Sequence, residues 1–511
     1  MASADTSDIP TRRLRGDTVL ILLVVIILVG AWLRFSGLAN QSLWNDELWT
    51  WDTASMGTLG EMLTESRLAR GEQTHPPLYF ILQHFVVRHI GDSETVLRLP
   101  SAVAGVLTIA AVYLLGRRLY SDTEGLIAAA LMAVVLFPVR YSQEARANSM
   151  VLLFALLATY FWVDVLRSLW KRERPRAWPL VAYLLCAMVL AALHYFGLYL
   201  VGLQGIATLV ICLVGARRSV VWLPLLYLPV VLVYIPWLPP MLRTLRMKRY
   251  WAAAPSTDPF FVVFTYMRHL YSRSDAFTWM FLALYAWLVG RALHEWITRR
   301  RDPAAEPATP HAGLLLVLWF TVPTVGAYVK SLVSTSVFYE RNLSIAFPAG
   351  YLLAARAIAR LPLRRRYLGV LTAAICVALT GHLMFGLRYY SSPHKDQFRE
   401  AARFVVDHPE YHSDAMIIGV CYGKRFFDYY FQRFGSSLRT EVHVGKEKTV
   451  PKVREAIAQR NPRYIWVLYG NFPPERPLLD YLRAHFRLVT GQQYPIRAGA
   501  LLFEAPRRTA P

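Results

Sequence analysis

Residues 19–32 read VLILLVVIILVGAW, a run that contains no charged side chain. Comparable runs occupy residues 126–139 and 152–162. Because about 20 helical residues cross the hydrocarbon core of a membrane, such runs predict membrane-spanning helices. The composition agrees, since 55% of the 511 residues are hydrophobic, whereas a soluble protein has roughly 45–50% apolar residues. The sequence therefore predicts a polytopic α-helical membrane protein.

The charge balance predicts the topology. The chain contains 56 Lys and Arg against 34 Asp and Glu, a formal net charge of +22. Lys and Arg accumulate in the cytoplasmic loops of membrane proteins, which is our main explanation of the excess. Attraction to anionic lipid or phosphate is the alternative. Nucleic acid is not an expected partner, because the basic clusters lie between apolar runs. These clusters are residues 12–15, 117–118, 167–176, 217–218, 299–301 and 360–366.

Placing all of these clusters on the cytoplasmic side requires paired spans between them. The N-terminus is then cytoplasmic and the C-terminus lies outside, as expected for a multi-pass membrane protein with this arrangement of charge. The expected spans are residues 18–36, 96–116, 124–140, 148–167, 178–196, 198–215, 220–238, 277–297, 313–331, 343–360 and 367–387.

One apolar segment does not fit this scheme as a span. Residues 77–90 read PLYFILQHFVVRHI, which is short and carries two histidines and an arginine. Counting it as a span would place later arginine clusters outside, so we predict an interfacial or re-entrant helix. Residues 59–68 form a second candidate surface helix. The predicted domains are a membrane domain, residues 1–387, with an outward loop at 37–95, and an outer soluble domain, residues 388–511.

The polar tail alternates helix-like and strand-like segments. Helices are expected at residues 396–407, 424–434 and 450–459, and strands at 415–420 and 464–469. This alternation predicts a small α/β domain. The four cysteines show no metal-binding spacing and indicate no disulfide framework.

Two motifs in the first outward loop carry candidate chemistry. In Trp44-Asn45-Asp46-Glu47, adjacent carboxylates can act as general base or metal ligand. The alternative is that Asp46 is the N-cap of a helix over residues 47–54. In the stretch THPPLY, residues 74–79, the two prolines fix a turn that aims His75 back at the membrane surface. The alternative is a stiff turn that only feeds the next helix.

Further polar turns are expected on the same membrane face. Residues 140–148 read RYSQEARAN, and an outward arginine such as Arg146 suits a phosphate, which it can bind bidentately. The alternative is an Arg146–Glu144 pair that caps two helices. His194 and Tyr195 lie where the fifth and sixth expected spans meet on the outer side, a position at which interfacial aromatics are common. Ionisable residues near a membrane usually have a function, so a lipid-linked phosphate and a proton acceptor would explain the whole set.

The order of these motifs resembles bacterial GT-C glycosyltransferases. The motifs are Asp46-Glu47, His75-Pro76-Pro77-Leu78, Arg98-Leu99-Pro100-Ser101, Tyr141-Ser142-Gln143-Glu144-Ala145-Arg146 and His194-Tyr195. The similar branch contains the protein O-mannosyltransferases and the aminoarabinose transferase of lipid A, and the resemblance covers residues 18–350. Residues 392–399, SPHKDQFR, are similar to the junction with that family's outer domain.

The resemblance implies a polyprenyl-phosphate sugar donor and surface helices in the first outward loop. It implies that Asp46 is the catalytic base, assisted by Glu47. The donor phosphate is expected to bind Arg146, Arg341 and Lys330. The remaining expected substrate-binding residues are His75, Tyr141, Glu144, His194, Tyr195, Tyr339, Arg268 and His269.

Two features depart from the family pattern. The O-mannosyltransferases have a β-rich outer domain, so the α/β tail gives no support to protein O-mannosylation. The lipid A branch has a Lys-Pro where this chain has His75-Pro76-Pro77, which puts a lysine contact to the phosphate in doubt here.

The expected activity is inverting transfer of a hexosyl or pentosyl group from the polyprenyl phosphate to a hydroxyl group. The acceptor is a lipid, glycan or protein of the cell envelope, on the extracytoplasmic face. A divalent metal ion near Asp46 is compatible with this chemistry but not required. The alternatives are a lipid or sugar carrier, which predicts inverted repeats and midplane charge, and a polymerase or ligase of lipid-linked glycans, which predicts a large outward loop between spans.

Overall fold

The computed structural model describes residues 16–68, 75–215, 217–246, 253–298, 311–445 and 449–506. The basic clusters at 12–15 and 299–301, and Thr74 of the proline turn, lie outside these residues. The chain forms two compact units. The first consists of Met1–Ser36, Leu63–Tyr79 and Leu99–Leu387, and the second of Gly37–Met62, Phe80–Arg98 and Arg388–Pro511. The second unit therefore combines the tail with two segments of the first predicted loop.

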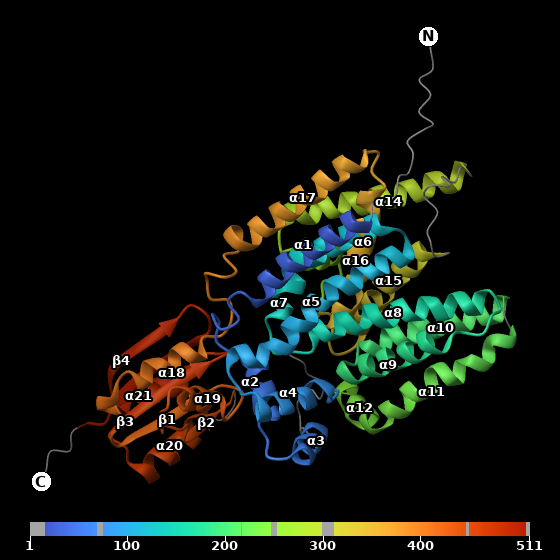
Figure 1. Cartoon of the computed structure of the whole chain (residues 1–511). Coiled ribbons are helices and arrows are strands. Elements are labelled where there is room, and N and C mark those ends of the chain that lie inside the picture. The colour runs from blue at the N-terminus through green and yellow to red at the C-terminus, as the bar shows by residue number, and fades with distance from the viewer. Residues whose placement is uncertain are drawn as a thin grey trace, which may run out of the picture. The chain divides into compact units, whose positions relative to one another are not determined.

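The first unit is helical, and its helices are coloured from blue to orange in Figure 1. Nine described helices are long and apolar enough to cross a membrane. These are Gly16–Phe35 (α1), Glu94–Leu119 (α5), Asn148–Trp170 (α8), Gly197–Val214 (within α10, Gly197–Gly215), Ser219–Thr244 (including α11, Trp222–Tyr234), Asp275–Thr298 (α14), Ala312–Val333 (α15), Asn342–Ala359 (including α16, Phe347–Ala359) and Arg365–Gly386 (including α17, Arg365–Gly381).

Two further predicted spans take shorter forms. Asp122–Val134 (α6) and Leu136–Ser142 (α7) form a pair bent by 58°. Pro138 explains the break, because a proline ring clashes with the carbonyl of the residue four positions earlier, here Val134. Ala177–Leu193 (α9) is apolar but has only 17 residues. Each predicted span thus coincides with a helix or a bent helix pair, and the polytopic helical fold is confirmed.

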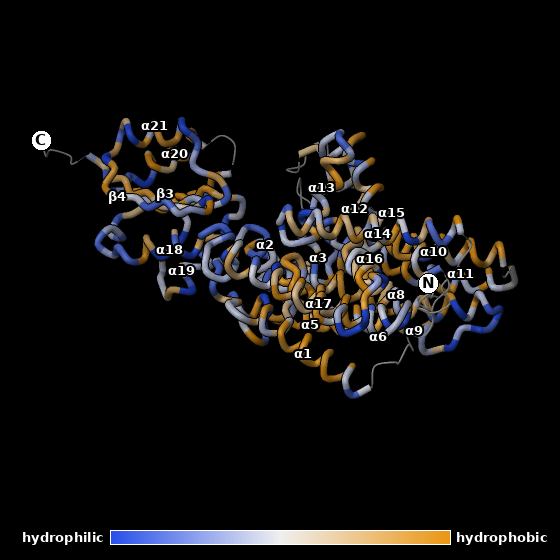
Figure 2. Tube along the Cα trace, turned by 90° about the horizontal axis from the view of Figure 1, so that it is seen from above, coloured by the Kyte–Doolittle hydropathy of each residue, from blue (hydrophilic) through white to orange (hydrophobic). Residues whose placement is uncertain are grey.

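Burial varies widely among these helices. The apolar window of Asn342–Ala359 is 89% buried, and α16 packs against α6, α14 and α15. The window of α1 is only 22% buried and leaves side chains such as Leu20 and Ile21 exposed. Figure 2 shows the hydrophobic colour along α1, α5 and α17. Apolar residues exposed along a spanning helix are expected to face lipid.

Three shorter helices follow α1, and the second and third agree with the two expected surface helices. They are Asn45–Ala54 (α2), Leu59–Leu68 (α3) and Leu78–His89 (α4). With 12 residues, α4 extends about 18 Å and is too short to cross a membrane. The first residue of α2 is Asn45, and its N-cap is Trp44. The alternative in which Asp46 is the N-cap is therefore wrong.

The α/β prediction for the tail is confirmed. Its five-stranded sheet has the order β2-β1-β3-β5-β4. The strands β1, β2 and β3 are parallel, and β5 is antiparallel to both β3 and β4. The strands are Ala415–Val420 (β1), Val442–Val444 (β2), Tyr464–Gly470 (β3), Arg487–Tyr494 (β4) and Ala498–Glu504 (β5).

Helices cover both faces of this sheet, as Figure 2 shows. On one face, Val453, Leu478 and Leu482 pack with Ile418 and Val467 of the strands. Val453 belongs to α20, and Leu478 and Leu482 belong to α21. The other face of the sheet carries α18 and α19. The helices are Phe398–Val406 (α18), Phe426–Arg433 (α19), Thr449–Arg460 (α20) and Arg476–His485 (α21).

Two helices that the sequence did not predict follow α11, and the first of them continues the segment Ser219–Thr244. They are Leu238–Arg246 (α12) and Pro259–Leu270 (α13). Asp258 is the N-cap of α13, because its carboxylate accepts the backbone N–H groups of Phe260 and Phe261. The last turn of α13 carries Arg268 and His269, so an ordered helix positions these two predicted site residues.

Candidate active site

The acidic pair lies in the first turn of α2, in the second unit. Glu47 is fully buried and ion-paired with Arg98. Two nitrogens of the Arg98 guanidinium, Nε and Nη2, donate to the two Glu47 carboxylate oxygens, each at 2.7 Å. Such bidentate pairs are the strongest charge-assisted hydrogen bonds in proteins. Glu47 also accepts the backbone N–H of Trp44 and so closes the start of the helix.

The remaining donors of Arg98 hold the loop before α2. They reach the carbonyl oxygens of Leu38 at 2.5 Å, Gln41 at 2.8 Å and Ser42 at 3.0 Å. Lys395 adds a second cation, with its Nζ 3.0 Å from Glu47 Oε2. Two cations thus compensate the buried Glu47 carboxylate. Such compensation is needed because a buried charge without a partner is strongly destabilising.

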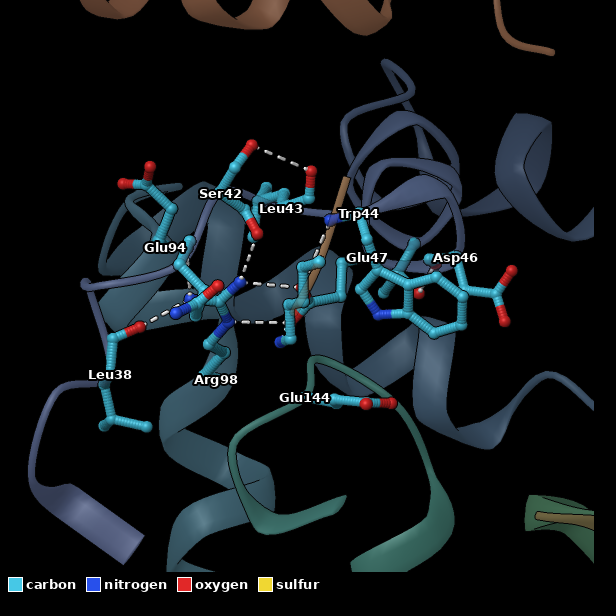
Figure 3. A network of polar contacts seen from close by, with 12 residues as sticks. Leu38, Ser42, Leu43, Trp44, Asp46, Glu47, Glu94, Arg98 and Glu144 are labelled. Atoms are coloured by element: carbon cyan, nitrogen blue, oxygen red, sulfur yellow. Dashed lines mark hydrogen bonds and ion pairs between the residues drawn. The ribbon is translucent and has the colours of Figure 1, made fainter. Parts of the chain in front are cut away.

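Asp46 differs from its neighbour. Figure 3 shows its carboxylate turned away from the Glu47–Arg98 pair. Its Oδ1 accepts a hydrogen bond from the Asn45 side chain at 3.1 Å. The helix therefore sends the Glu47 carboxylate into the buried network, whereas the Asp46 side chain is only partly buried.

In the first unit, the structure brings four predicted site residues together. Arg146 Nη2 lies 3.4 Å from His75 Nε2, and the rings of His75 and His194 are 5.8 Å apart. Burial and the charge of Arg146, together with His194 and Arg341, hold the pKa of His75 well below its usual range. Burial, Arg146 and Arg341 lower the pKa of His194 to about 3. Two neutral imidazoles beside two guanidinium groups form a site with a positive electrostatic potential. We name these four residues, His75, Arg146, His194 and Arg341, the basic cluster.

Hydrogen bonds fix the backbone of this cluster. The Ser101 hydroxyl donates to the Arg146 carbonyl at 2.9 Å and is itself 2.9 Å from the Tyr79 hydroxyl. Tyr79 follows the two prolines, so the turn of residues 75–79 is anchored within the first unit, beside the Arg146 turn.

A second charged cluster surrounds Glu340. Its carboxylate lies 2.8 Å from Arg273, 3.3 Å from Arg140 and 3.1 Å from His269. Burial alone would raise the pKa of the Glu340 carboxyl group. The charges of Arg273, Arg140 and His269 outweigh this effect, so the pKa is lowered. Tyr141 donates to Glu340 at 3.4 Å, and Glu144 pairs with Arg140 at 3.2 Å. Three predicted residues, Tyr141, Glu144 and His269, thus meet here.

Four predicted residues lie in other surroundings. Arg268 pairs with Asp275 on an exposed surface. The Lys330 ammonium donates to the Thr335 carbonyl at 2.8 Å. The Tyr195 ring contacts Tyr234, and the Tyr339 ring stacks below the Arg341 guanidinium. The roles given to these residues remain predictions.

Sequence reasoning assigned no role to Arg98, Lys395 or Glu340. Arg98 and Lys395 stood in quoted motifs, where a basic residue next to an apolar run was the available indication. Their partners could not be read from the sequence, because Glu47 is 51 residues from Arg98 and 348 from Lys395. Within the described residues, no group of three or more His, Cys, Asp or Glu side chains is arranged to hold a metal ion.

Comparison with known proteins gives a family match and a shared fold. Residues 74–242 match the family model described as dolichyl-phosphate-mannose-protein mannosyltransferase. This segment includes His75, Arg146 and His194 of the basic cluster. No curated protein is similar enough in sequence to count as a match.

Solved structures resemble the whole chain. ArnT from Cupriavidus metallidurans in the apo state has 13% identity and a TM-score of 0.55, covering 95% of this chain and 98% of ArnT. The same protein bound to undecaprenyl phosphate has 15% identity and a TM-score of 0.52, covering 96% and 98%.

The Archaeoglobus fulgidus oligosaccharyltransferase tethered with an acceptor peptide has 11% identity and a TM-score of 0.52, covering 88% of this chain and 69% of that one. At such identities the likeness establishes the fold. The match to the mannosyltransferase family model is limited to residues 74–242, and for the rest of the chain the comparisons show the shared fold.

Proposed function

We propose that this protein transfers a sugar from a polyprenyl-phosphate donor to a hydroxyl group of a lipid, glycan or protein, on the extracytoplasmic face of the bacterial inner membrane. Asp46 is the general base, and the donor phosphate binds in the basic cluster of Arg146, Arg341, His75 and His194. Glu47 assists by holding the first turn of α2.

The basic cluster carries this proposal. Desolvation and the charges of two arginines lower the pKa of two half-buried histidines, so the site disfavours a further positive charge and favours an anion. Arginine binds phosphate with its planar fork of donors. Three residues of the cluster fall in the segment that matches the mannosyltransferase family. ArnT, which shares the fold, has been solved with undecaprenyl phosphate.

An apolar pocket of the first unit suits the lipid part of such a donor. It has a volume of about 530 Å³ and lies between α10 and α11, lined by residues such as Leu198, Val201 and Tyr227. Its lining also includes Tyr234, whose ring contacts Tyr195 next to His194 of the basic cluster. An isoprenoid chain would bury apolar surface here while its phosphate binds the arginines.

The chemistry is a direct displacement. The acceptor hydroxyl oxygen attacks the anomeric carbon, the bond from that carbon to the phosphate oxygen breaks, and the polyprenyl phosphate leaves with the bonding electrons. Asp46 accepts the hydroxyl proton. Fixed cations stabilise the negative charge that grows on the phosphate. One base and no covalent intermediate imply inversion at the anomeric carbon.

The test uses purified full-length protein and an extracted pool of labelled undecaprenyl-phosphate sugars, with a bacterial envelope extract as acceptor. We expect release of undecaprenyl phosphate and appearance of label in a new glycoside. A carrier would move the donor across a vesicle membrane without breaking the sugar–phosphate bond, and that result would reject the proposal. A polymerase or ligase would extend a glycan chain instead of adding one sugar.

The proposed orientation has its own test. Cys421 is only 1% exposed, so its thiol is a poor reporter of topology. Ala458 is exposed on α20, and Ala458→Cys in a chain without other cysteines gives an accessible thiol. We expect an impermeant maleimide to label it from the periplasmic side of intact spheroplasts. Labelling only after the membrane is opened would reverse the proposed topology.

A further inference from the structure

Two adjacent charged residues of the tail, Lys395 and Asp396, are buried. The Lys395 side chain is 5% exposed and that of Asp396 is 1% exposed. Burying a charge is costly unless partners compensate it. Both residues precede α18, and neither belongs to a helix or strand of the tail sheet. Their partners should therefore indicate their role.

These partners lie in the first turn of α2. Lys395 pairs with Glu47 at 3.0 Å. The Asp396 carboxylate accepts the backbone N–H of Asn45. Asn45 and Glu47 are the two sequence neighbours of Asp46. Consecutive residues of the tail thus hold the chain immediately before and immediately after the proposed base.

The tail sheet in turn holds Asp396. Asn471 follows the last residue of β3 and donates to the Asp396 carboxylate at 2.9 Å. Arg497 precedes the first residue of β5 and lies 3.1 Å from the same carboxylate. Since β3 and β5 pair along their full length, Asp396 connects a rigid sheet to the N-terminus of α2. A carboxylate also interacts favourably with the positive end of a helix.

Asp396 lies close enough to Asp46 for their charges to interact. Burial raises the pKa of Asp396, Arg497 and Asn471 oppose this rise, and the Asp46 charge adds to it. The two carboxylates therefore interact, and Asp396 is part of the surroundings of the proposed base.

We propose that Lys395 and Asp396 are positioning residues for the transfer reaction, which fix the first turn of α2 and so the direction of the Asp46 carboxylate. This inference rests on the proposed function, in which Asp46 is the base. It gives the tail a direct part in catalysis, and neither residue needs to touch the donor or the acceptor.

The test compares Lys395→Met and Asp396→Asn with two matched controls in the full-length protein. Lys452→Met removes a lysine whose Nζ donates to the His443 carbonyl of the tail. Asp428→Asn changes a half-buried carboxylate that accepts the Thr440 backbone N–H. Transfer is followed with the labelled pool of undecaprenyl-phosphate sugars, and the folded fraction is measured by thermal unfolding in detergent.

We expect kcat per folded molecule to fall about 10- to 100-fold in Lys395→Met, because small displacements of a reacting group are costly. The donor KM should stay unchanged, and Lys395→Arg should restore part of the activity. Asp396→Asn should also lower kcat at an unchanged donor KM, because it weakens the link between the tail sheet and the first turn of α2. Both control variants should retain the kcat of the unchanged protein.

A double variant separates this inference from the proposed function. If Asp46→Asn is inactive and adding Lys395→Met changes its residual activity no further, the two residues act through Asp46. Full kcat in folded Lys395→Met, or in folded Asp396→Asn, would overturn the inference while leaving the proposed function intact. Full activity in Asp46→Asn would instead reject Asp46 as the base, and with it this inference.

Discussion

The Glu47 network of the second unit and the basic cluster of the first unit both gather charged groups, but their burial and charge balance differ. Glu47 is fully buried and compensated by Arg98 and Lys395, and the spare Arg98 donors bind backbone carbonyls. The side chains of the basic cluster are half-buried, and desolvation together with Arg146 and Arg341 lowers the pKa of His75. The first arrangement stabilises the protein itself, whereas the second becomes favourable when an anion binds. Charge balance therefore distinguishes a structural cluster from a binding site.

The largest expected effect tests the structural side of this comparison. Arg98→Met leaves Glu47 with a buried charge and one cation, and should lower the free energy of unfolding by about 3–5 kcal/mol. Adding Glu47→Gln removes that charge and should restore much of the loss. Thermal unfolding in detergent measures both. Arg487→Met is the control, because its pair with Glu504 is largely exposed and should be worth less than about 1 kcal/mol.

The second effect concerns the binding side. Arg146→Ala should weaken the affinity for undecaprenyl phosphate about 10- to 100-fold, because a hydrogen bond to a charged group contributes roughly 1.5–3 kcal/mol. Stability should fall little, because removing one of several like charges relieves repulsion. Binding in nanodiscs measures the dissociation constant, with Arg487→Ala as control. An unchanged constant would remove Arg146 from the phosphate site.

The third effect is a pH dependence of stability. Because the pKa of His75 is well below the ordinary 6.5, the unfolded chain binds more protons than the folded protein below that pH. The unchanged protein should therefore lose stability as the pH falls below 6.5, by at most about 1.4 kcal/mol per pH unit from this group. His75→Gln cannot be protonated, so its stability should fall less steeply. Equal slopes between pH 6.5 and 5 would contradict this account of the cluster.

The smallest effect separates Lys330 from the arginines. Its ammonium already donates to the Thr335 carbonyl, so we expect it to contribute a screened attraction to the phosphate. Lys330→Ala should weaken undecaprenyl phosphate binding only a few-fold, in the range of about 0.2–1 kcal/mol. A loss as large as that of Arg146→Ala would make Lys330 a direct ligand.

Much of the fold could be predicted because its determinants are local. Apolar runs bounded by arginines located each span, and the length of residues 77–90 identified α4 as a surface helix. The bend between α6 and α7 depends on Pro138. It was not predicted, because Pro138 lies within a continuous apolar run that also fits a straight span. The strand β4 is largely exposed and has no regular alternation of burial, so its sequence carried no strand pattern.

The site was less predictable because its contacts are distant in sequence. Asp46 and Glu47 are adjacent and chemically similar, so the motif alone could not separate their roles. The separation depends on Arg98 and Lys395, which reach Glu47 from residues far along the chain. The Arg146 turn could be recognised from the sequence. Arginines usually lie in cytoplasmic loops, so an arginine on the outer side indicates a functional role.

The most direct test of this account is single-turnover sugar transfer by Asp46→Asn, measured beside Glu47→Gln. Asp46→Asn should bind undecaprenyl phosphate normally, unfold at an unchanged temperature and lose at least about 100-fold in transfer rate, as removal of a general base requires. Glu47→Gln should lose stability and retain more activity per folded molecule. Transfer at the full rate by Asp46→Asn would contradict the assignment of the base.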